Sequence, residues 1–264
     1  MRARIIPIAI LLAASASPSL AQRGGPAPQE GSWDITLGGG AMLRPTFEGS
    51  DRTRIRPVPL ISVKWRDTIS LGEGGLSAYW HHQNFRIGGG LTYSSGRDER
   101  GSGGSFVNGD DRLAGLGNID QALGLRVFAS QKLAFVNFDI AATKFMGANN
   151  KGVEMNFGAS TPFPLGGKFI VVPHVRATWA NDSYMQTYFG VTPLQASRSI
   201  FPAFSAGAGI KDVEGGVNLV YRMNRHWFVL GDVSVERLMG DAARSPISIS
   251  DTSVGATTLI GYRF

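Results

Sequence analysis

Long segments in which apolar and polar residues alternate with a period of two recur along most of the chain. Successive side chains of a β-strand point to opposite faces, so this alternation predicts strands. The closing segment shows it clearly, with Val254, Ile260 and Tyr262 on one face and Gly255, Thr257 and Arg263 on the other. Twelve segments carry the signal: 33–44, 54–66, 68–80, 85–94, 119–130, 134–143, 153–161, 169–179, 203–211, 215–222, 227–236 and 253–264.

The length of these segments separates two all-β folds, a soluble sandwich and a membrane barrel. Many exceed the usual strand length of about 5 or 6 residues and match the 9 to 11 or so that a tilted strand needs to cross a membrane. Aromatic residues lie near the ends of the apolar faces, as in a lipid-facing band with aromatic girdles. Because lipid offers backbone groups no partners, the sheet must close. We predict a transmembrane antiparallel β-barrel over residues 32–264, with about 12 strands and with 10 or 14 as alternatives.

The first residues resemble a secretory signal. Arg2 and Arg4 precede an apolar run, Ile5 to Ala14, and Ser19-Leu20-Ala21 forms a cleavage site. We expect a signal peptide at 1–21, cleavage after Ala21, and a flexible lead-in at 22–31. The apolar run is shorter than the roughly 20 residues of a spanning helix. The chain has no cysteine, so disulfides cannot stabilise it after export. The expected location is the outer membrane of a Gram-negative cell.

The predicted connections differ strongly in length. Arg66-Asp67, Gln131-Lys132, Val213-Glu214 and Asn224-Arg225 are tight, whereas 96–118, 181–202 and 239–252 are long. If both termini are periplasmic, strict alternation of twelve strands places the first and last connections outside and the two longest, 96–118 and 181–202, on the periplasmic side. This departs from the short periplasmic turns of known barrels. Either the strand count is off by one in the middle, or these loops reach into the periplasm or the lumen.

The faces opposite the apolar ones carry charged residues near mid-strand. In a barrel these side chains face the lumen, where they either pair and fill a narrow interior or line a cationic channel that favours anions. A barrel of about twelve strands lies between side-chain-filled and water-filled sizes. We favour the filled lumen and keep the channel as an alternative. The candidate lumen charges are Arg86, Arg126, Asp139, Arg176, Arg222, Asp232 and Glu236.

Other motifs give no catalytic, cofactor or metal site. Adjacent His81 and His82 point to opposite faces of a strand, and Asp110-Asp111 lacks the ligand spacing of a calcium loop. The glycine triplets have no helix after them, so they do not predict a nucleotide site. His174 is the best base for a hydrolase, which stays a weak alternative, because no serine follows it at a recognisable spacing. The positive charge has no nucleic-acid-binding pattern, and lipopolysaccharide phosphates are its simpler partner.

Several short motifs appear together in a fixed order. They are Phe47-Glu48-Gly49-Ser50-Asp51, Arg56-Pro57-Val58-Pro59, residues 113–120 (LAGLGNID), residues 188–196 (YFGVTPLQA), residues 206–213 (AGAGIKDV), residues 237–247 (RLMGDAARSPI) and Tyr262-Arg263-Phe264. Together they resemble the MipA/OmpV family of outer-membrane proteins, the family of the MltA-interacting protein, over essentially the whole mature chain. Phe47, Arg52 and Arg244 depart from the expected family pattern.

The resemblance implies a non-enzymatic role. It implies a scaffold that joins the outer membrane to peptidoglycan-remodelling enzymes, with a lytic transglycosylase and a peptidoglycan synthase as partners. A narrow porin-like channel is the alternative. We expect the long loops to bind the partner, and the candidate residues are Leu113, Gly115, Leu116, Gly117, Asp120, Tyr188 and Phe189.

Overall fold

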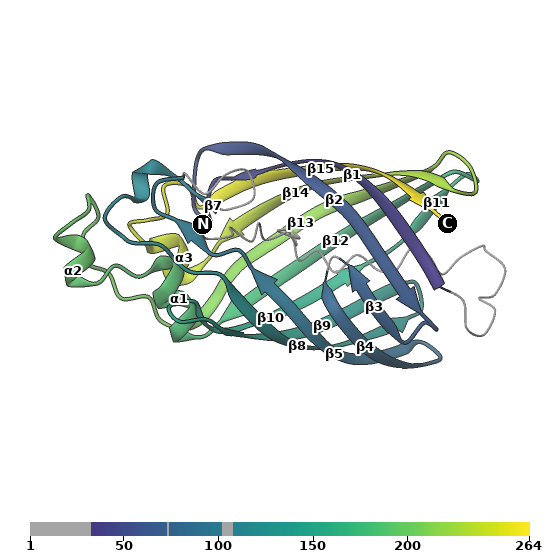
Figure 1. Ribbon diagram of the computed structural model, residues 1–264, viewed down its shortest axis with the longest axis horizontal. Helices are drawn as coiled ribbons and strands as arrows, with labels where there is room; N and C mark the ends of the chain where they lie inside the picture. Colours follow the sequence, from purple (N-terminus) through teal and green to yellow (C-terminus); the bar gives the residue numbers. More distant parts are fainter. Residues whose placement is uncertain (1–32, 73, 102–107) are drawn as a thin grey trace, which may run out of the picture.

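The alternating segments form one antiparallel sheet that closes on itself (Figure 1). The computed structural model describes residues 33–72, 74–101 and 108–264, so the predicted signal peptide and lead-in lie outside the described residues. The barrel strands follow one another in chain order around the wall, and the pairing of the last strand, β15, with the first, β1, closes the ring. They are β1 (Trp33–Pro45), β2 (Thr53–Trp65), β3 (Ile69–Gly72), β4 (Gly75–His82), β5 (Phe85–Ser94), β8 (Ala122–Leu133), β9 (Val136–Met146), β10 (Lys151–Ser160), β12 (Phe169–Ala180), β13 (Gly209–Arg222), β14 (Trp227–Leu238) and β15 (Thr252–Arg263).

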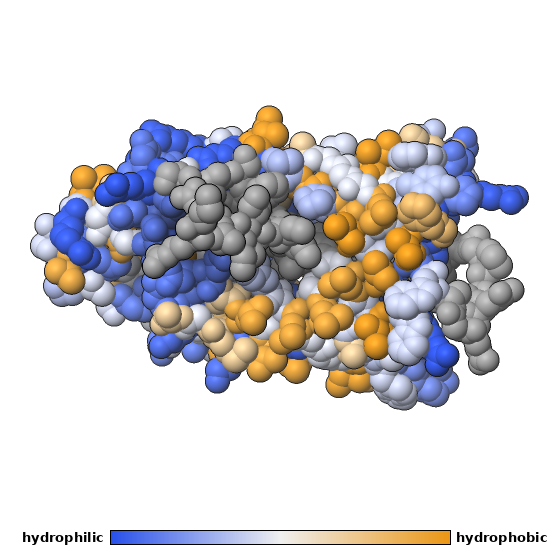
Figure 2. Space-filling view, in the orientation of Figure 1, coloured by the Kyte–Doolittle hydropathy of each residue, from blue (hydrophilic) through white to orange (hydrophobic). Residues whose placement is uncertain are grey.

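Large apolar side chains cover the outside of this wall. Val127 is 62% exposed, Val175 59% and Val233 58%, and each lies between inward-facing neighbours on its strand. Figure 2 shows these apolar residues spread over the middle of the barrel, with hydrophilic residues gathered toward both ends. A soluble protein rarely exposes so large an apolar surface, whereas a barrel in lipid requires it. Exposed aromatic residues mark the end where the chain finishes: Trp33, Trp80, Phe135, Phe163, Trp227 and Phe264.

The prediction for the closing strand is confirmed. β15 pairs antiparallel with β1 from Thr36↔Arg263 to Leu43↔Ala256. Val254 and Ile260 are exposed on the lipid side, while Gly255 is buried on the lumen side. The pairing of the last strand with the first removes the free edges that an open sheet would leave in lipid.

Three of the twelve predicted strands are wrong, although one is split and two are merged, so the total is unchanged. The segment 68–80 is two strands, β3 and β4, joined by a tight turn. Gly75 adopts φ +88° there, and a Cβ on it would lie 1.9 Å from the Leu91 carbonyl oxygen, so only glycine fits. The segment 215–222 and the last three residues of 203–211 belong to one strand, β13, whose alternation is interrupted by a β-bulge between the partners of Thr178 and Trp179, while 203–208 lies in the preceding connection.

The split of β3 from β4 changes which connections share an end of the barrel. Of the two alternatives for 96–118 and 181–202, the error in the strand count is confirmed, because 68–80 contributes two strands and both loops lie at the same end as the first and last connections. Antiparallel pairing places 46–52, 95–121, 147–150, 181–208 and 239–251 at one end. The start of β1, the C-terminus and the short turns lie at the other end (Figure 1). The expected pattern of short turns on one side and long loops on the other is thereby restored.

The remaining elements lie in the connections. The helices are η2 (Asp111–Leu113), α1 (Asp182–Phe189), α2 (Pro193–Ala196) and α3 (Gly240–Arg244), all at the long-loop end. The short strands β6 (Arg97–Asp98) and β7 (Asn108–Gly109) pair in parallel, and β11 (Phe163–Leu165) pairs antiparallel with the start of β12 at the other end. Among the described helices, none is long and apolar enough to span a membrane.

Candidate functional site

The long connections pack on one another and cover one end of the barrel. We call the described parts of 46–52, 95–121, 147–150, 181–208 and 239–251 the cap. Apolar side chains from different connections meet in two buried clusters, so the loops hold each other in place. One cluster contains Phe47, Leu113, Leu116, Val191, Phe201 and Ile247, and the other contains Ala180, Tyr184, Met185, Phe189, Ala206, Leu238 and Ala242.

Asp110 joins the first two connections of the cap, 46–52 and 95–121. Its carboxylate accepts hydrogen bonds from the Thr46 hydroxyl, from Arg52 Nη1 and from the Arg112 backbone and side chain. Burial opposes ionisation of this carboxyl, but the hydrogen bonds from Arg112 outweigh burial, so the pKa of Asp110 lies well below its ordinary value. Arg112 also binds Asp51 at 2.6 Å. The acidic pair predicted to be a poor cation site therefore binds arginines, and Asp111 also contacts Arg52.

Helix α1 carries aromatic residues over the lumen. Asn181 caps its first turn, because the Asn181 side chain accepts from the backbone N–H of Tyr184 and also from that of Val153 on β10. Residues spaced one helical turn apart, Tyr184 and Tyr188, lie on the same helix face and stack at 4.5 Å between ring centroids. This face points from the cap into the barrel.

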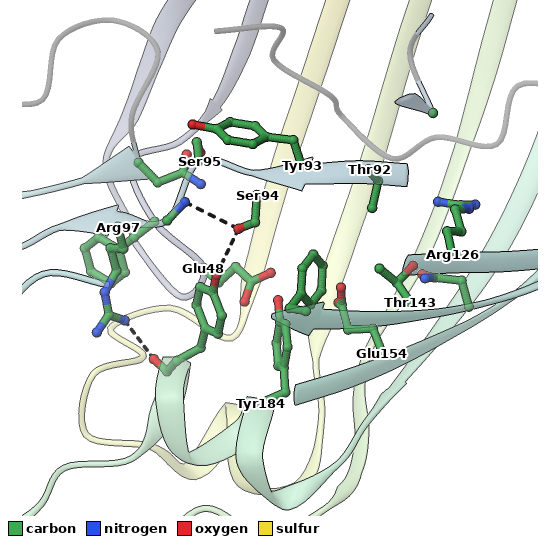
Figure 3. Close-up of a pocket in the computed structure, with 17 residues that line it drawn as sticks. Glu48, Thr92, Tyr93, Ser94, Ser95, Arg97, Arg126, Thr143, Glu154 and Tyr184 are labelled. Atoms are coloured by element: carbon green, nitrogen blue, oxygen red, sulfur yellow. Dashed lines mark hydrogen bonds between the residues drawn. The ribbon is translucent and has the colours of Figure 1, made fainter. Parts of the chain in front are cut away.

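A cavity of about 200 Å³ lies directly beneath the cap (Figure 3). Aromatic rings, hydroxyls and charged side chains from the cap and from β5, β8, β9 and β10 surround it. Its lining residues are Phe47, Glu48, Gly74, Thr92, Tyr93, Ser94, Ser95, Gly96, Arg97, Asn108, Arg126, Thr143, Phe145, Glu154, Asn156, Tyr184 and Tyr188.

Lys211 neutralises carboxylates beside this cavity. Its ammonium nitrogen lies 2.7 Å from Glu48, 3.1 Å from Glu154 and 3.3 Å from Asp212, and 5.2 Å from the centroid of the Tyr184 ring. Burial raises the pKa of Glu48 above its ordinary value, although Lys211 opposes this shift. Glu48 Oε2 has no hydrogen-bond partner among the described residues. The cluster thus holds more negative than positive groups.

The β-bulge in β13 makes this cluster possible. Thr178 pairs with Asp212 and Trp179 with Ile210, so Lys211 is the extra residue of the bulge. In a regular strand Lys211 and Asp212 would point to opposite faces, but both are buried here, with 6% of each side chain exposed. A bulge commonly re-aims a side chain in this way.

Several of the predicted lumen charges lie close to other charged or aromatic side chains along the inner wall. Arg44 on β1 lies 3.8 Å from both Glu214 and Asp232, and Arg176 lies 3.2 Å from Glu214. Arg86 lies over the rings of Tyr79 and Phe128, and Arg126 lines the cavity. Asp139 lies close enough to Arg176 and Arg126 for their charges to interact. Glu236 on β14 is the cross-strand partner of Glu214 on β13, and Arg222 is the last residue of β13.

His174, the hydrolase candidate, lies among these inner-wall side chains. Its Nδ1 is 2.9 Å from the Asn218 amide and its Nε2 is 3.5 Å from Glu214. Gly216 on β13 is the cross-strand partner of His174 on one side and of Ser234 on the other, so Ser234 lies near His174. The two residues are far apart in the sequence, so their spacing did not reveal this serine. Because both imidazole nitrogens already have neighbours, neither is directed at the Ser234 hydroxyl, which a nucleophilic serine would require.

The two adjacent histidines, His81 and His82, lie apart from the cap. His82 stacks on Trp80 at 5.9 Å, and His81 lies 4.0 Å from Asp67. Within the described residues, no three His, Cys, Asp or Glu side chains form a group that could hold a metal ion.

The candidate partner-binding residues have structural roles in the cap. Leu113, Leu116 and Phe189 are almost fully buried in the two clusters. The backbone N–H groups of Gly115 and Gly117 donate to Glu99, and the Tyr188 carbonyl accepts from Arg97. Asp120 is exposed, and its backbone N–H donates to Asn149. Partner binding by these residues stays a prediction.

Sequence reasoning did not select Glu48, Glu154 or Lys211 as site residues. Glu48 and Lys211 are 163 residues apart, so no local spacing connects them. The available signal was the polar pair Lys211-Asp212 at the point where the alternation of a strand breaks, which is typical of a bulge.

Comparison with known proteins identifies relatives at the level of family and fold. The model of the family described as MltA-interacting protein MipA matches residues 37–264. No curated protein matches the sequence. Similar solved structures include a bacterial polysaccharide outer membrane secretin (TM-score 0.43, 11% identity, covering 90% of this chain and 100% of that one). Another is the COG4313 outer membrane channel from Pseudomonas putida F1 (TM-score 0.43, 8% identity, 90% and 97% coverage). These likenesses concern the barrel fold alone.

Proposed function

The chain belongs to the MltA-interacting protein MipA family, and we propose that it acts as an interaction protein of the outer membrane. In this role it holds a periplasmic peptidoglycan-remodelling enzyme, a lytic transglycosylase of the kind the family is named for, close to the membrane. A peptidoglycan synthase is the second proposed partner, and the protein would hold it close to the lytic transglycosylase.

The observation that carries this proposal is the combination of family membership with a closed interior. The cap covers one end of the lumen, and oppositely charged side chains such as Arg44 and Glu214 lie close together across the inner wall. A barrel with such an interior offers its ends, rather than an aqueous pore, as the working surface.

The end that carries the short turns fits a periplasmic partner best. Barrels of this class place their short turns in the periplasm and their longer loops outside. Arg66, Lys168 and Arg225 are exposed on three different turns of this end. Positive charges at the rim of an interface speed the association of an acidic partner, and we propose this role for these three basic residues.

Lipopolysaccharide is the proposed lipid partner at the cap end. Lys144 on β9 and Lys151 at the start of β10 are exposed near the cap. At this level the outer surface of the barrel would meet lipid phosphates, which lysine binds as a point charge.

The experiment is co-purification with a lytic transglycosylase from outer membranes. The test variant combines Arg66→Glu, Lys168→Glu and Arg225→Glu. The matched control makes the same charge change on exposed residues at the cap end of the barrel, with Arg198→Glu and Arg244→Glu in the cap and Arg237→Glu near the end of β14. We expect the first variant to lose the partner and the second to keep it, with both remaining heat-modifiable on gels.

The opposite result would place the partner on the cap. Deletion of 113–120 would then test the candidates Leu113, Gly115, Leu116, Gly117 and Asp120, and substitution of Tyr188 and Phe189 by alanine would test the other two. Retention by both triple variants would refute a role for the basic turns.

A narrow channel is the second candidate function. The observation that favours it is the set of arginines on the inner wall, Arg86, Arg126 and Arg176, which would attract anions. Single-channel recording in planar bilayers tests it, since a conductance that reverses its ion preference in Arg126→Glu would support a channel.

A further inference from the structure

Among the residues that the structure describes, the barrel wall is incomplete on the cap side between β2 and β5. β3 and β4 end at Gly72 and Gly75, well short of the cap, whereas β2 continues to Thr53 (Figure 1). β3 has four residues and β4 has eight, fewer than the 9 to 11 or so that cross a membrane. Two neighbouring strands therefore fill only the lower part of the wall, toward the short-turn end.

One side of the resulting opening is an unpaired edge of β2. The pairing of β2 with β3 covers only Val63–Trp65, and no strand of the described chain pairs with Thr53–Ser62 on this side. The motif Arg56-Pro57-Val58-Pro59 lies on this edge. Proline has no amide hydrogen and is tolerated in strands where its nitrogen faces an unpaired side. The two prolines therefore suit β2 to remain without a partner here.

The opposite side is the end of β5, and the cavity beneath the cap lies against it. β5 pairs with β4 only as far as Leu91. Beyond that point the consecutive residues Thr92, Tyr93 and Ser94 all line the cavity. Figure 3 shows Thr92 and Ser94 on one side of the strand and Tyr93 on the other. The end of β5 therefore borders the cavity on the side where β4 stops.

The rest of the rim comes from the turn below and the cap above. Gly74 at the tip of the β3–β4 turn and Asn108 of β7 both line the cavity. Asn108 accepts a hydrogen bond from Arg56 of β2, which fixes the upper rim to the free edge. The opening thus has four defined sides among the described residues.

Apolar side chains surround the opening on the outside. Ile55 on β2 is 71% exposed, Leu91 on β5 is 44% exposed, and Leu123, the partner of Tyr93 on β8, is 56% exposed. These residues belong to the lipid-facing belt, so the opening faces the membrane. Inside, the lining is polar and balanced in charge, with Glu48 and Glu154 against Arg97 and Arg126.

We infer that the cavity opens sideways into the outer half of the membrane and binds the head of a single-chain amphiphile whose head group is zwitterionic. The tail would stay in lipid beside Ile55 and Leu91, and the head would enter between β2 and β5. Drug-sized ligands occupy roughly 300 to 1,000 Å³. A cavity of about 200 Å³ accommodates a head group, and the opening lets the tail remain outside. This inference does not depend on a periplasmic partner.

The absence of cysteine makes the opening directly testable. Single variants Ser94→Cys at the inner rim, Ile55→Cys on the lipid face and Thr257→Cys on the lumen side of β15 are placed in phospholipid vesicles. The probe is a maleimide joined to an alkyl chain, which dissolves in the bilayer. We expect it to label Ile55→Cys and Ser94→Cys and to leave Thr257→Cys unlabelled. A small water-soluble maleimide in detergent checks that all three thiols are reactive.

Binding is tested by protection. Dodecylphosphocholine added to the vesicles should abolish labelling of Ser94→Cys and leave Ile55→Cys unchanged, while phosphocholine without a tail should have no effect. If Ser94→Cys is labelled no faster than Thr257→Cys, the wall is closed and the inference is wrong. Labelling without protection overturns the ligand assignment. Thr92→Cys replaces Ser94→Cys if that variant does not fold, because the Ser94 hydroxyl accepts hydrogen bonds from Gly96 and Asn150.

Discussion

Replacement of Lys211 by methionine tests whether charge pairing holds the cap on the barrel. The substitution keeps much of the length and apolar stem of the side chain and removes the ammonium group. Three carboxylates within 3.3 Å of that group, those of Glu48, Glu154 and Asp212, then lose their shared cation. Because Glu48 belongs to the cap and the others to the wall, the loss falls on the junction between them.

The expected effect is large. At an effective dielectric constant of about 20, opposite charges 2.7 to 3.3 Å apart attract by about 5 to 6 kcal/mol per pair. Desolvation of the four groups offsets most of this attraction. Removing one partner from a buried pair nevertheless costs about 3 to 5 kcal/mol, because the remaining charges are left uncompensated. We expect Lys211→Met to lower the free energy of unfolding by this amount at pH 7.

The pH dependence gives a second signature. Glu48 already has a pKa above its ordinary value because of burial, and loss of Lys211 removes the opposing attraction, so its pKa rises further. A carboxyl whose pKa is higher in the folded state binds protons more tightly there. The destabilisation of Lys211→Met should therefore decrease as the pH falls through the folded-state pKa of Glu48. The double variant Lys211→Met with Glu48→Gln should recover part of the loss at pH 7.

Urea unfolding of the barrel in phospholipid vesicles, followed by tryptophan fluorescence, measures the change. Lys144→Met is the control, because Lys144 is exposed on β9 and such surface substitutions change stability by about 0.5 kcal/mol or less. A loss of less than about 1 kcal/mol in Lys211→Met, or an equal loss in both variants, would refute the argument.

Three further predictions concern the cap. Asp110→Asn should cost about 1.5 to 3 kcal/mol of local stability, because charged hydrogen bonds from Arg52 and Arg112 are lost, and faster hydrogen exchange in the described parts of 95–121 would show it. Because the pKa of Asp110 lies below its ordinary value, ionised Asp110 contributes its full stabilisation of the cap above the unfolded-state pKa of about 4. This stabilisation is lost as the pH falls through the folded-state pKa. Protease resistance of the cap that is already lost at pH 5 would contradict this prediction. Ile247→Ala, at a fully buried position, should cost about 2 to 5 kcal/mol by leaving a cavity, and an unchanged urea midpoint would contradict it. In planar bilayers we expect the intact protein to be silent and a variant lacking 181–208 to conduct, whereas steady conductance of the intact protein would argue for the channel.

The barrel could be predicted from sequence because its signal is local and repeated. Val254 and Ile260 alternate with Gly255 and Arg263, and this pattern alone assigns the two faces of β15. The same rule failed where the backbone departs from a regular strand. The turn at Gly75 divides one predicted strand into two, and the bulge at Lys211 makes one strand look like two.

The candidate site could be predicted only in part for a related reason. Inward-facing charges such as Asp232 follow from the alternation of their own strand. The cap does not, because Phe47, Leu113 and Ile247 meet only after distant loops have folded over the barrel. Buried positions in these loops have no period to reveal them, so Leu113 and Phe189 could be taken for exposed binding residues.

The ion pair between Asp34 and Arg263 also constrains how the protein reaches its folded state. These residues lie 229 positions apart, and their strands form the seam at which the ring closes. No shorter part of the chain can make this contact, so the wall cannot close until the last residues have been exported. Contacts between residues so far apart in sequence form slowly, and the partly folded chain exposes unpaired strand edges until they have formed. The kinetics of insertion, rather than the stability of the finished barrel, should therefore be the most sensitive to changes at Arg263.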